Sequence, residues 1–186
     1  MPENKVNYGI KNAHYATYTE SGGIITYDTP IPLPGSVELS LEARGDMIEF
    51  YADDMLYYKA PNNQGYNGTL SIANIPESFA IDVLGEEKHE TDKVLTEKAN
   101  AKGKPFAFLF EFDGDVKATR HVMYNCAANR PNLSGSTTTD TVEPQPNELT
   151  FIASARSTDL AVKTKTTPET TATVYDNWYK AVYSTP

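Results

Sequence analysis

The stretch PFAFLFEFDGD, residues 105–115, has phenylalanine at every second position, namely at Phe106, Phe108, Phe110 and Phe112. Because successive side chains of a β-strand point to opposite faces, this spacing predicts a strand with one face made entirely of phenylalanine. The DGD that follows at 113–115 is a hairpin signal. Its partner strand is expected in VKATRHVMYNCAA, residues 116–128. We therefore predict that the four phenylalanines form part of the core of a β protein.

Further segments with alternating or β-branched residues predict that strands make up most of the chain. These segments are HYATYT (14–19), GIITY (23–27), SVELSLEA (36–43), GTLSIA (68–73), VLTEKA (94–99) and ELTFIASA (148–155). VLTEKA is expected to neighbour the phenylalanine strand. In SVELSLEA the alternation places Val37, Leu39 and Leu41 on one, core-facing side. Antiparallel sheets with one buried and one solvated face show this pattern.

The segment NIPESFAIDVLGEE, residues 74–87, predicts the principal helix of the protein. Pro76 suits a first helical turn, and Gly85 supplies a stop. Phe79 and Val83 stand four residues apart, so they share one face of a helix. Such an apolar stripe predicts packing against the core.

Residues 44–66 carry more aromatic and apolar side chains than an ordinary surface loop needs. Two aromatic β segments flank Asp53 and Asp54, a pattern that predicts a hairpin or a long arm. Loops of this length usually have a function, and exposed apolar surface commonly marks an interaction site. The side chains in question are Phe50, Tyr51, Met55, Leu56, Tyr57 and Tyr58.

These elements predict a single domain over residues 1–186, with the arm at 44–66 and a C-terminal extension at 156–186 that packs on the domain. Within the extension, TTATVYDNWYKAVYS (170–184) fits a short amphipathic helix containing Trp178, although its threonines favour a strand. The predicted fold class is mainly β: an antiparallel β-sandwich with one flanking α-helix and a long hairpin arm.

The composition excludes several classes of protein. The formal net charge is −9, and the lysines and arginines are scattered, so the basic face that tight nucleic-acid binding requires is not visible. The twelve tyrosines fit either an association surface or ordinary cross-strand pairs. The first residues contain no signal-peptide core, and no apolar run approaches about 18 residues. We expect the protein to be made and kept in the cytoplasm, without a membrane.

No enzyme, cofactor or metal site is predicted. His14, His89 and His121 are widely separated and match no metal-ligand motif. Cys126 is the single cysteine and lies in a strand-like run, where a buried small hydrophobe is expected. Without a catalytic motif, the features left to explain are the exposed aromatic residues and the strand edges. These favour a structural protein that assembles through its strand edges.

Several segments resemble the major tail proteins, or tail tube proteins, of long-tailed bacteriophages (siphophages) of Gram-positive hosts. The similarity covers about residues 5–155. It is carried by VNYGIKNAHYATYT (6–19), by GTLSIANIPESFAIDVLG (68–85), by KGKPFAFLFEFDGD (102–115) with KATRHVMYNCAANRP (117–131), and by TTTDTVEPQPNELTFIASA (137–155). In that family the last segment is a polar linker followed by a strand.

The resemblance implies a β-sandwich whose copies form hexameric rings, in which the inner sheets close into one barrel. The rings stack into the tail tube, the conduit for DNA ejection into the host. It further implies a virion protein that binds copies of itself, the tape measure protein, the tail terminator and the distal tail protein, while DNA passes without specific binding. Needle-like secretion tubes share the fold.

Within this picture we expect specific roles for the residues above. Glu38, Glu42 and Glu111 are the candidates to face the lumen, because each lies opposite the apolar face of its strand. The arm is the candidate contact between stacked rings. The predicted core consists of Phe79, Val83, Phe106, Phe108, Phe110 and Phe112.

Two other interpretations stay open. The chain could be a related structural protein, either a tail terminator or a secretion-system tube. It could also be a carbohydrate-binding β-sandwich, in which Tyr57, Tyr58 or Trp178 would stack on sugars.

Overall fold

The computed structural model describes residues 3–135, 137 and 144–184. One nine-stranded antiparallel sheet dominates it, which confirms the predicted mainly β fold. Along the main path the strand order is β2-β1-β10-β11-β12-β7-β4, while β13 pairs with β11 and β3 with β1. The strands are β1 (Asn7–Ser21), β2 (Ile24–Tyr27), β3 (Ile31–Pro32), β4 (Ser36–Ala43), β7 (Tyr66–Ile72), β10 (Phe106–Gly114), β11 (Thr119–Ala128), β12 (Asn147–Ser154) and β13 (Lys163–Lys165).

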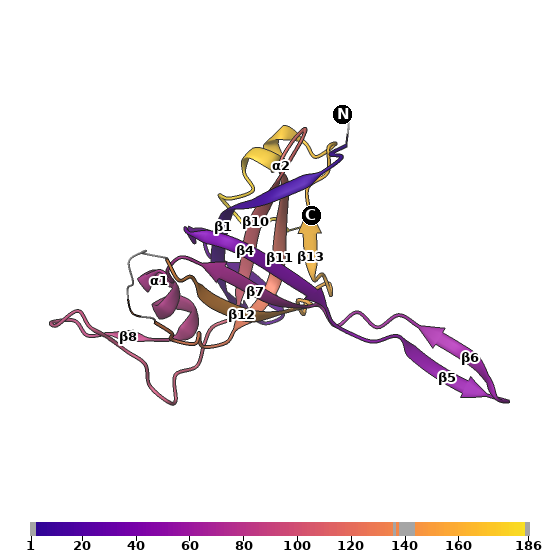
Figure 1. The fold of residues 1–186 in the computed structure, drawn as a ribbon, viewed down its shortest axis with the longest axis horizontal. Coiled ribbons are helices and arrows are strands. Elements are labelled where there is room, and N and C mark those ends of the chain that lie inside the picture. The colour runs from indigo at the N-terminus through magenta and orange to yellow at the C-terminus, as the bar shows by residue number, and fades with distance from the viewer. Residues whose placement is uncertain (1–2, 136, 138–143, 185–186) are drawn as a thin grey trace.

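The sheet folds over on itself. Strands β4 and β7 cross the β1–β10–β11 part at a steep angle (Figure 1), and β4 contacts β1 although the two do not pair. Side chains that point between the two parts are shielded from water, as in a sandwich. This space holds the main core.

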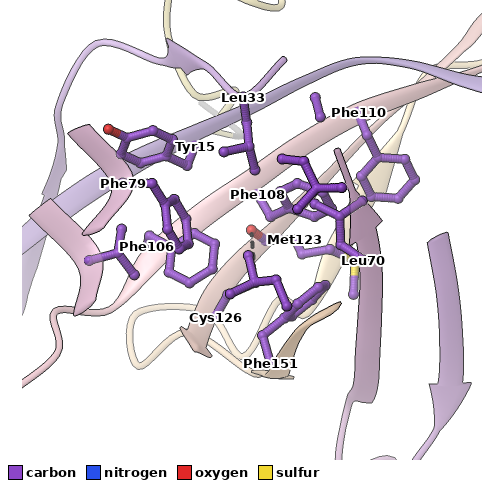
Figure 2. Close-up of a cluster of buried hydrophobic side chains, with 14 of the residues drawn as sticks. Tyr15, Leu33, Leu70, Phe79, Phe106, Phe108, Phe110, Met123, Cys126 and Phe151 are labelled. Carbon is purple, nitrogen blue, oxygen red and sulfur yellow. Dashed lines mark hydrogen bonds between the residues drawn. The ribbon is translucent and has the colours of Figure 1, made fainter. Parts of the chain in front are cut away.

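The phenylalanine strand supplies the centre of that core. Phe106, Phe108 and Phe110 are each 1% exposed or less, and Phe108 packs edge-on against Phe151 of β12 with ring centroids 5.3 Å apart. Figure 2 shows these rings together with Phe79, which packs edge-on against Phe106. Because this cluster joins β10 to β12 and to the helix, it holds the layers together.

The helix is short and changes character along its length. Helix α1 (Glu77–Phe79) continues into a π-helical turn, η1 (Ala80–Leu84), and ends at Gly85 with φ of 80°. Phe79 and Val83 are both buried in the main core. Phe112, at the end of the phenylalanine face, is partly buried against the same cluster.

Strand β10 is also covered on its second face. Ala107 and Leu109 belong to a smaller apolar cluster together with Trp178, which is 2% exposed. The covering segment is the C-terminal part of the chain, which includes β13 and helix α2 (Ala172–Asp176). The strand is therefore enclosed on both sides.

Two strand predictions were wrong in detail. The segment 94–99 contributes only β9 (Leu95–Thr96), which pairs with β8 (Glu87–Lys88) in a small separate hairpin and does not neighbour β10. Val37 is 60% exposed, because a register irregularity between Ser36 and Glu38 interrupts the alternation there. Leu39 and Leu41 are partly buried against the main core. The polar linker predicted before β12 lies in part outside the described residues.

Candidate functional site

The feature that stands out is a projecting arm, defined here as residues 44–66. Its strands β5 (Ile48–Ala52) and β6 (Met55–Ala60) pair only with each other, in an antiparallel hairpin. Asp53 and Asp54 form the turn, with φ angles of 53° and 59°. Positive φ at both central residues is typical of a type I′ hairpin turn, which matches the twist of the flanking strands. The hairpin extends away from the folded body (Figure 1).

The arm exposes its apolar side chains to solvent. Their exposed fractions run from 43% at Leu56 to 70% at Tyr57. The full set is Met47, Ile48, Phe50, Tyr51, Met55, Leu56, Tyr57 and Tyr58. An isolated two-stranded hairpin is marginally stable in water, and apolar surface concentrated on one feature marks an interaction site. The six side chains predicted as contacts all lie in this set.

The base of the arm is fixed to the sheet. The Arg44 amide donates to the Gly65 carbonyl at 2.8 Å, and the Gln64 amide donates to the Arg44 carbonyl at 3.0 Å. Gly45 and Gly65 have φ of 104° and 90°. A Cβ at Gly45 would lie 2.0 Å from the Asn62 carbonyl oxygen, so only glycine fits there. The direction of the arm is thus set by the backbone.

Strand β4 ends the sheet and leads into the arm. It hydrogen-bonds to β7 and is the last strand of the sheet order. Edge strands carry unpaired backbone groups that can pair with another chain. Glu38 and Glu42, two of the three predicted lumen residues, are exposed on this strand.

The third lumen prediction, Glu111, is corrected by the structure. Glu111 is 5% exposed, and its carboxylate accepts hydrogen bonds from three side chains. The donors are Arg120 Nε at 2.9 Å, Asn12 Nδ2 at 2.6 Å and Tyr179 Oη at 3.1 Å. In the described structure the C-terminal segment covers this face of β10, so Glu111 does not line a surface.

The same segment encloses the positive partner of that carboxylate. The Arg120 guanidinium lies over the ring of Tyr175, with 3.8 Å to the centroid, and also 5.1 Å from the ring of Tyr179. It donates to the Tyr175 carbonyl as well. Burial, followed by the nearby Glu111 charge, raises the pKa of Tyr179. Opposite charges, a cation–π contact and apolar cover together attach the C-terminal segment to β10 and β11.

The remaining reactive groups do not converge. Full burial raises the pKa of the Cys126 thiol, which disfavours the thiolate. Burial, followed by the charges of Lys165 and Lys163, lowers the pKa of His121 to about 4. Within the described residues, no group of three or more histidine, cysteine, aspartate or glutamate side chains could hold a metal ion. In the same part of the chain no helix is long and apolar enough to cross a membrane.

A family model described as phage tail tube protein matches residues 2–184. Among solved structures, a chain of the PVC sheath–tube complex of an extracellular contractile injection system, in the extended state, is similar with a TM-score of 0.50 and 14% identity. The match covers 88% of this chain and 93% of that one, and it shows a shared fold. A chain of the anti-feeding prophage cap, a tube-terminating cap, matches with a TM-score of 0.45 and 15% identity, over 89% of this chain and 96% of that chain. No curated protein matches significantly.

Proposed function

Because this chain belongs to the phage tail tube protein family, with a structural role in the virion tail, we propose that its copies form hexameric rings that stack into the tube. The tube would conduct DNA into the host during ejection. Family membership supports self-assembly, and the hexamer and the ejection role are the parts that we add. A Gram-positive host stays a prediction from the resemblance.

The exposed arm is the observation that carries this proposal. When another chain covers this apolar surface, the free energy of the system falls by roughly 25 cal/mol per Å² of apolar area buried. Its fixed base points it away from the body (Figure 1), where a second copy can reach it. We propose that the arm contacts the neighbouring ring, through Phe50, Tyr51, Met55, Leu56, Tyr57 and Tyr58.

Ring closure would use the edge of the sheet. If β4 pairs with the edge of a neighbouring copy, the sheets of a ring continue into one barrel and no open edge remains. Glu38 and Glu42 are then our candidates for the lumen. Carboxylates on that wall would repel the phosphates of passing DNA and prevent adhesion.

The rival interpretations make different predictions. A tail terminator caps a tube and does not polymerise. A carbohydrate-binding protein would act as a monomer and bind glycans through exposed aromatic rings. Trp178 is 2% exposed and cannot stack on a sugar, whereas Tyr57 and Tyr58 are exposed on the arm.

The test is electron microscopy of the purified protein in negative stain, which should show tubes. Deletion of residues 50–60 should leave folded subunits that do not polymerise. The pairing at the base of the arm remains in that variant, and far-UV circular dichroism together with Trp178 fluorescence checks its fold. Tubes of normal length from the deletion variant would refute the role of the arm. Absence of any assembly from the parent protein would refute the tube.

A further inference from the structure

A cavity of about 310 Å³ lies at the end of the molecule that holds the N-terminus. Three segments enclose it: the first described residues, the turn between β10 and β11, and the segment that follows β13. It is distinct from the arm and from the β4 edge. The proposed ring and tube give it no role so far.

The cavity presents the groups of an anion-binding site. The residues that line it include Lys117 and Lys165, together with Thr119 and Thr167. Glu3 is the only carboxylate among the described lining residues. Within the described chain, neither lysine has a carboxylate within ion-pair distance. These donors suit a carboxylate ligand.

The two lysines have different surroundings. The Lys117 ammonium lies 3.5 Å from the centroid of the ring of Tyr175, a residue outside the cavity lining, in a cation–π contact that leaves its charge in place. The charge of Lys165 is felt by the neighbouring His121, whose low pKa leaves that ring neutral at pH 7. Two lysines and one glutamate give the described lining a formal charge of +1, in a protein with a net charge of −9.

The cavity wall is built before any ligand arrives. The Asn4 side chain accepts hydrogen bonds from the amides of Val116 and Lys117 at 3.2 and 3.0 Å, and donates to the Lys117 carbonyl at 2.6 Å. The Lys5 amide donates to the Asp115 carboxylate at 2.8 Å. Because the turn is held in one conformation, a ligand does not have to order it.

The tip of the arm has the complementary chemistry. Asp53 and Asp54 are exposed side by side at the hairpin turn, with the exposed apolar side chain of Met55 next to them. The cavity offers a matching apolar group in Val116, which is 48% exposed. Nine residue steps separate Arg44 from the tip, so the arm reaches about 30 Å from its base.

The two features are different patches of the molecule. In Figure 1 the arm extends to the lower right from the end of β4, whereas the N-terminus, beside which the cavity lies, is at the top of the body. A contact between two different patches of identical copies is head-to-tail. Repeated from copy to copy, such a contact builds an open-ended filament unless the copies close into a ring. Stacked rings require a contact of this kind.

We propose that the acidic tip of the arm, Asp53-Asp54, docks into the cavity at Lys117 and Lys165 of a copy in the adjacent ring. This rests on the proposed function, since it assumes that the arm bridges rings, and it names the surface that the arm meets. The ligand of the cavity is a second copy of this chain.

Charge reversal tests the electrostatic part. The double variant K117E/K165E should raise the concentration needed for tube formation by about tenfold, because attraction becomes repulsion. D53N/D54N should raise it less, and asparagine keeps the positive φ of the turn. The matched control is K102E/K104E, which changes the charge equally on an exposed segment outside the cavity. The control should assemble like the parent, and K117E/K165E tubes that match it would overturn the proposal.

A disulfide trap tests the geometry while all four charges remain. The variant A52C/T167C places one thiol beside the tip and one at the cavity. Mild oxidation of its tubes should give a ladder of covalent oligomers on a non-reducing gel. The control A52C/T91C, with the second thiol in the exposed loop between β8 and β9, should give none. Cys126 is buried and does not interfere.

The outcomes separate the two proposals. If deletion of residues 50–60 abolishes tubes but A52C/T167C tubes give no ladder, the arm acts elsewhere and the docking proposal is overturned alone. If the deletion variant still polymerises, the role of the arm falls together with the docking. A ladder from A52C/T167C alone supports both.

Discussion

Glu111 and Arg120 form an ion pair inside the protein, with Arg120 Nε 2.9 Å from the Glu111 carboxylate. The two residues face each other on neighbouring strands, β10 and β11. Tyr179 covers the pair and donates a hydrogen bond to the same carboxylate. A pair in this position is costly to break, because the remaining charge stays out of water.

We expect R120M to destabilise the subunit by about 3 kcal/mol, because it leaves the Glu111 carboxylate buried without its cation. Urea denaturation followed by the fluorescence of Trp178, the only tryptophan, measures this. The control is K11M, which removes an exposed ion pair with Asp113 and should have a much smaller effect on the urea midpoint than R120M. Equal losses in the two variants would contradict the structural role of the buried pair.

Phe110 is fully buried, with its ring stacked 5.2 Å from Phe108 and 5.0 Å from His121. F110D should abolish soluble subunits, since it places an unpaired carboxylate in the core. The control F50D, on the exposed arm, should give folded and soluble protein. Expression and size-exclusion chromatography compare the two. A folded, ring-forming F110D variant would disprove the position of the phenylalanine strand.

Gly68 lies against the ring of Phe151, and a Cβ there would be 2.2 Å from the ring. We expect G68A to cost about 1–3 kcal/mol, because Phe151 is itself packed in the core and has to shift. G135A is the matched control, since no atom of the residues that the structure describes lies within 4 Å of a Cβ at that position. Thermal unfolding of both variants is the measurement. A melting temperature of G68A equal to that of G135A would show that the ring moves freely.

The pKa of His121, lowered to about 4 mainly by burial, predicts a pH dependence of stability. The unfolded state binds the proton below about pH 6.5 while the folded state does not until about pH 4. Stability from this group is therefore complete above pH 6.5 and is lost as the pH falls toward 4, by about 3 kcal/mol. H121F should flatten this part of the profile in urea titrations. An unchanged slope in H121F would assign it to other groups.

The sequence predicted those parts of the fold that local periodicity determines. The phenylalanines at every second position identified β10, because a two-residue period is the pattern of a strand. The hairpin between β10 and β11 and the arm were also predicted, since aspartate and glycine have strong turn preferences. The predicted turn at 113–115 was misplaced, because β10 continues through Gly114 and β11 begins only at Thr119. In each case the signal lies within about ten residues.

What the sequence did not predict depends on distant contacts. Glu111 has the pattern of a solvent-facing residue, and its cover comes from Tyr179, 68 positions away. The exposure of Val37 depends on an irregular pairing with β7, which no propensity encodes. The cavity at Lys117 and Lys165 likewise joins segments that only the fold brings together.

The two glycines at the base of the arm have a consequence for the geometry of the tube. If the arm bridges rings, the angle at which it leaves the body sets how far each ring rotates relative to the one below. Gly45 and Gly65 fix that angle through conformations that other residues rarely adopt. The helical pitch of a tube many rings long would then depend on two positions that have no side chain.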